Sequence, residues 1–279
     1  ILSQNEKWNG ISQWLHLASL DLADRQTVGR IAIILRHLYE KIIDRSKLIL
    51  HLCTNEPFYT DGISVMEKYV ASIPCRSSAH PEDYGKAMNI PFPKEHHHIE
   101  LFKIPAAVSY SAMVLKSADP MDPKQAHQMV LGYLLTTNQL WERVRGIGGA
   151  YGVSASNDLL ERLFVFSSYR DPRIDGTLND FIQVLELVAE HGIDLNLIEQ
   201  AIISIVGREL KPLYPKEAAM TSFRRALYGI SDEYRKQRRS WILNATSDDM
   251  RQAAIALLEE ARQFSSTVVL AGPAVIDKE

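Results

Sequence analysis

The order of the predicted elements from residue 98 to the C-terminus constrains the fold most strongly. Two adjacent apolar runs, residues 98–104 and 107–115, predict strands separated by a turn at Pro105. A helix is predicted at 122–141. The rest of the chain predicts strands at 151–156 and 163–169, helices at 177–190, 195–208, 216–228, 232–243 and 247–264, and a closing strand at 267–271. Strands that precede a run of helices favour an α+β fold, with a mixed, largely antiparallel sheet covered by helices.

The strand predicted at 107–115 alternates in character along its length. Ser109 and Ser111 share one face, and the other face carries Val108, Tyr110, Ala112 and Val114. This period of two is typical of a half-buried strand.

The first part of the chain is predicted to be mainly helical. Helices are expected at 11–20, 24–43 and 61–72, and the run "KLILHLC" at 47–53 predicts a buried strand. In the second helix, five apolar residues at helical spacing predict one buried stripe: Ile31, Ile34, Leu35, Leu38 and Ile42. Residues 75–94 are polar and rich in proline and glycine, and we interpret them as a connector.

A weak internal repeat indicates how the chain is organised. Helix-then-strand at 24–53 resembles helix-then-strand at 247–271, because five apolar pairs share one offset. We therefore expect residues 1–94 to hold the end of one domain plus a connector, and residues 95–279 to form a complete domain of the same kind. The chain opens without an initiator Met, so we expect it to be a piece of a longer protein.

Composition excludes some classes of function. The net charge of −3 argues against a generic nucleic-acid-binding protein, which would be basic. No apolar run reaches the roughly 18 residues that a membrane-spanning helix needs, so we expect a water-soluble protein. Cys53 and Cys75 form neither a disulfide framework nor a zinc cluster, and we predict that both are reduced core residues. This favours a soluble protein of a bacterial cytoplasm or an organelle matrix.

The stretch "VRGIGGAYG" at 144–152 is the most informative motif. A dinucleotide fingerprint needs a strand, a glycine turn and then a helix, whereas here a helix precedes and a strand follows. Tyr151 stands where the last glycine should be, and no Lys-Ser or Lys-Thr pair completes a P-loop. A structural interpretation, in which Gly146 and Gly148 end the helix and allow close packing, leaves the flanking Arg145 and Tyr151 unexplained.

Other polar clusters carry weaker signals. His96 and His98 in "EHHHIE" would share a face of a strand, but two ligands without a third do not make a metal site. The basic run "YRKQRR" at 234–239 predicts a solvated, salt-bridged helix face. "GVSAS" at 152–156 lacks the last glycine of a nucleophile elbow, and Cys75 has no evident histidine partner.

"VRGIGGAYG" resembles the Arg-x-x-Gly-Gly-Ala-Tyr-Gly region in the last domain of the pitrilysin/insulinase metallopeptidases, in their presequence-protease branch. "FSSYRDP" at 166–172 and "LYGISDEYRKQRRSWIL" at 227–243 resemble later segments of that branch and occur in its order. Residues 1–74 resemble, more weakly, the end of the family's third domain.

This resemblance implies four similar α+β domains in two halves that close around a peptide chamber. It implies a zinc ion in the first domain, on an inverted His-x-x-Glu-His motif that this chain lacks. The chain thus resembles the non-zinc, C-terminal half, with no cofactor of its own. In the family, the corresponding Arg and Tyr reach the substrate, which implies that role for Arg145 and Tyr151. Gly148, Gly149 and Arg170 are implied as further substrate-binding positions, and Arg170 could also order its own turn through Asp171.

The expected function is the substrate-binding half of a zinc metalloendopeptidase that degrades unstructured peptides. Its expected partners are peptides and the N-terminal half of the same protein, with no nucleic acid and no membrane. Alone, the fragment is expected to be inactive. Two alternatives stay open: a non-catalytic scaffold or partner subunit of the same fold, and a nucleotide-dependent enzyme.

Overall fold

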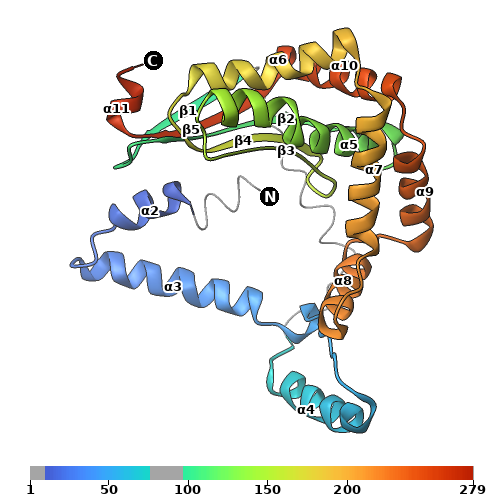
Figure 1. Cartoon of the computed structure of the whole chain (residues 1–279). Helices are drawn as coiled ribbons and strands as arrows, with labels where there is room; N and C mark the ends of the chain where they lie inside the picture. The colour runs from blue at the N-terminus through green and yellow to red at the C-terminus, as the bar shows by residue number, and fades with distance from the viewer. Residues whose placement is uncertain (1–9, 76–96, 279) are drawn as a thin grey trace. The chain divides into compact units, whose positions relative to one another are not determined.

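The computed structural model describes residues 10–75 and 97–278 and divides the chain into two compact units (Figure 1). One unit comprises residues 1–91 with 214–223, and the other comprises residues 92–213 with 224–279. Within the described residues, no helix combines the length and apolar character that crossing a membrane requires.

A mixed sheet forms the centre of the second unit. Its strands are β1 (His97–Lys103), β2 (Ser109–Lys116), β3 (Gly152–Asp158), β4 (Leu163–Asp171) and β5 (Ser265–Ala271). Among the described residues the sheet has five strands in the order β1-β5-β2-β4-β3. Only the β1–β5 pair is parallel, and the three other pairs are antiparallel. The predicted α+β class and the largely antiparallel sheet are confirmed.

Helices cover one face of this sheet (Figure 1). The second unit contains α5 (Pro123–Thr137), α6 (Asp175–His191), α7 (Leu195–Leu210), α9 (Asp232–Leu243), α10 (Ser247–Gln263) and the short α11 (Pro273–Ile276), while α8 (Pro215–Leu227) contributes residues to both units. Local capping signals start two of these helices. The Asp122 carboxylate caps α5 ahead of Pro123, and Thr246 and Asp249 form a capping box at α10.

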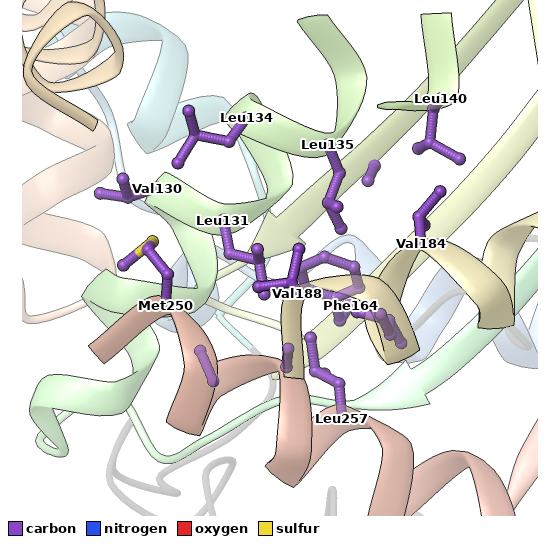
Figure 2. Packing of buried hydrophobic residues seen from close by; sticks show 14 of the residues in the cluster. Val130, Leu131, Leu134, Leu135, Leu140, Phe164, Val184, Val188, Met250 and Leu257 are labelled. Atoms are coloured by element: carbon purple, nitrogen blue, oxygen red, sulfur yellow. The ribbon is translucent and has the colours of Figure 1, made fainter. Parts of the chain in front are cut away.

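The core lies between the sheet and helices α5, α6 and α10. Figure 2 shows Leu131, Leu135, Val188 and Leu257 converging there around Phe164. The Phe166 ring on β4 also stacks on the Phe181 ring of α6, with 5.1 Å between their centroids. Burial of each such side chain contributes about 1.5–3 kcal/mol, so this layer accounts for much of the stability of the unit.

The alternation predicted for β2 is confirmed, and its helix-covered face is the serine face. Ser109, Ser111, Met113 and Leu115 are buried, whereas Tyr110, Ala112 and Val114 are only partly buried. The pairing register aligns Tyr110 with Leu270 on one side and Tyr169 on the other, and Leu270 with Phe102. These four side chains therefore share the other face of the sheet, which we call the open face.

The first unit contains the predicted helices, but two other predictions for it are wrong. Its helices are α2 (Ile11–Ala18), α3 (Arg25–Ile42) and α4 (Tyr59–Ser72). The apolar stripe of α3 is not buried, because four of its members are exposed: Ile34, Leu35, Leu38 and Ile42. Residues 48–53 form no strand and follow a short 3₁₀ turn at Arg45–Lys47. A strand needs a hydrogen-bonded neighbour, and the described part of this unit offers none.

Two smaller predictions for the first unit have different outcomes. Cys53 and Cys75 are free and exposed, so the prediction that they are core residues is wrong. Both lie in irregular segments, Cys53 before the 3₁₀ turn at Glu56–Phe58 and Cys75 after α4. The predicted connector at 75–94 lies outside the described residues except for Cys75.

A histidine in the second unit predicts a pH dependence of stability. His127 of α5 is largely buried, with its Nδ1 3.4 Å from Oδ1 of Asp249. Burial lowers the pKa of His127 below its ordinary 6.5, and the charges of Asp249 and Asp122 oppose this only in part. The unfolded chain therefore binds this proton more readily, and the free energy of unfolding should decrease as the pH falls below about 6.5.

Urea unfolding of His127→Gln between pH 5 and 8 checks this expectation. The variant should lose part of the acid destabilisation that the wild type shows. The exposed His191→Gln serves as the control and should keep the wild-type profile. Identical profiles for wild type and His127→Gln would contradict the assignment.

Candidate functional site

A π-helical turn presents the first predicted site residue. The chain leaves α5 and continues into a π-helix at Trp141–Ile147, which carries Arg145 on its exposed side. The Arg145 guanidinium carbon lies 5.9 Å from the centroid of the Trp141 ring, within the range of a cation–π contact. π-helical turns are rare and occur frequently at functional sites.

The glycine bend, which we define as residues 146–151, closes this turn through backbone hydrogen bonds. Gly148 N donates to Arg143 O at 2.9 Å, and Ala150 N donates to Val144 O at 3.0 Å. Gly149 has a φ of +84°, which a residue without a Cβ adopts readily. The bend thus ends a helix, as the structural interpretation of the glycines predicts, and it also delivers Tyr151 to the surface with 66% of its area exposed.

Arg170 lies at a bulge in β4. The register between β2 and β4 pairs Tyr110 with Tyr169 and Ser109 with Asp171, which leaves Arg170 as the extra residue. Its φ of +52° is unusual for a side chain of this size. Its carbonyl accepts a hydrogen bond from Tyr151 N at 3.3 Å, and its guanidinium carbon lies 5.8 Å from the Tyr151 ring centroid.

The Tyr151 ring also joins the aromatic side chains of the open face. It meets the Tyr169 ring edge-on at 6.0 Å, and Tyr169 meets the Tyr110 ring at 5.3 Å. Tyr151 therefore has an aromatic neighbour on one side and the Arg170 cation on another, and its phenol remains accessible. Such an exposed phenol can donate a hydrogen bond to an oxygen that gains negative charge.

The structure brings two of the five predicted site residues, Tyr151 and Arg170, into contact, and the other three precede Tyr151 in the chain. Arg145, Gly148, Gly149 and Tyr151 belong to the π-helical turn and the glycine bend, and Arg170 contacts Tyr151 from the bulge. The prediction that Arg170 orders its turn through Asp171 is wrong in its partner: the two oxygens of the Asp171 carboxylate accept from Arg173 N and from Thr177 Oγ1, while the Arg170 guanidinium lies beside Tyr151. The neighbours Trp141 and Tyr169 were not predicted. Trp141 could have been found, because it stands four residues before Arg145.

Among residues 10–75 and 97–278, no group of three or more His, Cys, Asp or Glu side chains could hold a metal ion. His98 Nε2 pairs with Glu100 Oε1 at 2.7 Å on β1, and His96 lies outside the described residues. The described residues therefore do not fit a zinc site. The basic run at 234–239 is salt-bridged, as predicted: Arg235 pairs with Asp232 at 2.7 Å and Arg239 with Glu209 at 3.2 Å. It is solvated only in part, because Arg238 is half-buried against Met129.

Comparison with known proteins identifies the family. Residues 99–272 match the family described as the PreP C-terminal domain. The mitochondrial presequence protease of Eremothecium gossypii is 29% identical over 96% of this chain, which covers 27% of that relative. The chain thus spans about a quarter of that relative's length.

Solved structures show the same fold. The peptidase M16 inactive domain of Pseudomonas fluorescens superimposes with a TM-score of 0.55 at 14% identity, covering 76% of this chain and 50% of that one. Pitrilysin superimposes with a TM-score of 0.56 at 14% identity, covering 79% of this chain and 24% of that one. This chain belongs to the PreP C-terminal domain family.

Proposed function

We propose that this chain is the substrate-binding, C-terminal half of a zinc-dependent oligopeptidase that degrades unstructured peptides. The observation that carries the proposal is the joint exposure of Arg145 and Tyr151 at the glycine bend, in a chain whose family is that of presequence proteases. In this proposal the metal and the residue that activates water lie outside the chain. The chain alone is then inert.

Each residue has a role that its chemistry suits. Hydrolysis of a peptide bond develops negative charge on the carbonyl oxygen, and a phenol donor and a guanidinium both stabilise such charge. Arg145 could also grip peptide carbonyls and set the register of the substrate. Arg170 supports this arrangement through its contact with Tyr151. Gly148 and Gly149 belong to the bend that delivers Tyr151 to the surface, just after the π-helix that carries Arg145.

We also propose that residues 1–94 are the end of a third metallopeptidase-like domain with a connector, and that residues 95–279 are the fourth. The exposed apolar side of α3, which includes Ile34, Leu35 and Ile42, supports this proposal. Exposed apolar stripes of this kind mark surfaces that contact other protein. The partners in this proposal are peptide substrates and the N-terminal half.

A reconstitution experiment tests the proposed function. The chain is mixed with the N-terminal half of the same protein, and cleavage of an unfolded fluorogenic peptide is followed. Each half alone should be inactive, and the mixture should cleave the peptide. Cleavage by the N-terminal half alone at the rate of the mixture would contradict the proposal.

The same assay addresses the scaffold alternative. A chain that only supports the fold would restore activity equally well with Arg145→Ala and Tyr151→Phe together. A contributing chain would restore little activity once both side chains are changed. Because this chain has both Arg145 and Tyr151, we expect the double variant to restore little activity.

A further inference from the structure

We propose that Arg173 is a positioning residue that holds the glycine bend, and through it Arg145 and Tyr151, in working geometry. This inference rests on the proposed function for what the bend does, but the contacts that carry it belong to this chain alone. Arg173 follows β4 and sits in the turn before α6. It contacts no substrate in this proposal and acts through the bend.

The Arg173 guanidinium lies against the glycine bend. A Cβ on Gly148 would overlap this guanidinium, so the absence of a side chain at 148 makes room for it. Arg173 Nη2 also donates to Arg143 O at 3.4 Å. The same carbonyl accepts from Gly148 N, the hydrogen bond that closes the π-helical turn. Arg173 therefore contacts Arg143, two residues before Arg145, and Gly148, three residues after it.

Helix α6 anchors the guanidinium from the other side. Arg173 Nη2 lies 3.0 Å from Oδ2 of Asp180, whose side chain is only 13% exposed. Asp180 Oδ1 lies 3.5 Å from Arg143 Nη1, which donates to Gln183 Oε1 at 2.7 Å. The carboxylate of Asp180 thus links two arginines, one from the turn before α6 and one from the π-helix. A partly desolvated pair of this kind fixes orientation better than an exposed one.

The backbone of Arg173 is fixed as well. Its N–H donates to Asp171 Oδ1 at 2.9 Å, and its carbonyl accepts from Ser109 Oγ at 2.8 Å. Asp171 is fully buried and directly follows Arg170, whose carbonyl accepts from Tyr151 N. The turn from Arg170 to Arg173 consequently contacts the bend at two points, near Arg145 and at Tyr151.

Kinetics of the full-length protein test this role. Arg173→Ala should lower kcat for an unfolded peptide by about 10- to 100-fold, with a smaller change in KM, because misplaced groups lose transition-state contacts first. Arg251→Ala is the matched control: its guanidinium also donates to backbone carbonyls, those of Ala189 and Glu190, at 2.7 and 2.8 Å. That control should keep wild-type kcat. A kcat of Arg173→Ala within twofold of the control would overturn the inference.

A second set of variants separates positioning from general stability. If Arg173 acts through the two site residues, Arg173→Ala should cost little further turnover in an Arg145→Ala/Tyr151→Phe background. An equal fold-loss in both backgrounds would overturn the inference. Should Arg173→Ala fail to fold, Arg173→Lys keeps the charge beside Asp180 but not the planar group, and the same comparison is made with it.

A spectroscopic measurement on the chain separates this inference from the proposed function. In protein labelled with 5-fluorotryptophan, the Trp141 signal is assigned by its loss in Trp141→Phe. Arg173→Ala should shift or broaden that signal, while Arg251→Ala should not, and an unchanged signal would overturn the inference. If Tyr151→Phe retains full turnover but Arg173→Ala still changes the Trp141 signal, the proposed function is wrong. The inference that Arg173 holds the glycine bend is then still supported.

Discussion

Replacing Tyr151 by Phe in the full-length protein should lower turnover of an unfolded peptide by about 10²- to 10³-fold, the usual effect of deleting one donor to a developing oxyanion. Arg145→Ala should produce a loss of at least similar size, because it removes a charge and a grip on the peptide backbone. Both variants should bind as much zinc as the wild type, since neither residue is proposed to touch the metal. Initial rates and metal content of the purified variants check both expectations.

The control for this pair is Tyr228→Phe, which removes the hydroxyl of another exposed tyrosine. It should turn over peptide at the wild-type rate. Normal turnover in both Tyr151→Phe and Arg145→Ala would contradict the assigned roles. Loss of zinc together with activity would instead indicate a general disturbance of the protein.

Gly148→Ala should have the second largest effect. Its Cβ would overlap the Arg173 guanidinium and lie only 2.6 Å from the carbonyl oxygen of Val144, which belongs to the backbone and cannot move aside cheaply. Overpacking of this kind costs about 1–3 kcal/mol of stability. Because the bend must shift to relieve it, we expect at least a tenfold loss of turnover as well, on the order that a misplacement of about 1 Å produces.

Gly146→Ala is the matched control two residues earlier. A Cβ there would meet Trp141 O at 3.6 Å, an ordinary contact, within a helical turn that favours alanine over glycine. Its thermal midpoint and turnover should stay close to the wild-type values. Equal losses of thermal stability and turnover in Gly148→Ala and Gly146→Ala would contradict the close approach of Arg173 to Gly148.

The elements of the second unit could be predicted because their signals are local. Periodicity located its strands and long helices, and the strands before a run of helices indicated the α+β class. Local signals could not show which face of β2 the helices cover. Ser109 is accommodated in the covered face because its hydroxyl donates to Arg173 O, a partner 64 residues away. The open face consequently carries Tyr110, which the alternation alone would place in a core.

The first unit shows the opposite case. The apolar stripe of α3 and the run at 47–53 are genuine sequence patterns, but burial and strand pairing depend on a second surface. Within the described residues of that unit no such surface covers Leu35 or Ile49. Helix α3 still forms, because Asp24 caps it through hydrogen bonds to Gln26 N and Thr27 N.

The candidate site could be found from sequence only in part. Arg145, Tyr151 and the glycines stand together in the chain, so their pattern is visible. The Arg170 bulge depends on the register between β2 and β4, and the Arg173–Asp180 pair depends on where α6 lies against the bend. Tertiary contacts of this kind leave no periodic signal.

The structure of the full-length protein with an uncleaved peptide in place would test the central claim most directly. We predict that Tyr151 Oη and the Arg145 guanidinium both lie within hydrogen-bonding distance, about 2.7–3.2 Å, of carbonyl oxygens of the peptide beside the bond to be cut. A peptide bound elsewhere, with both groups turned to solvent or toward different surfaces, would contradict the account.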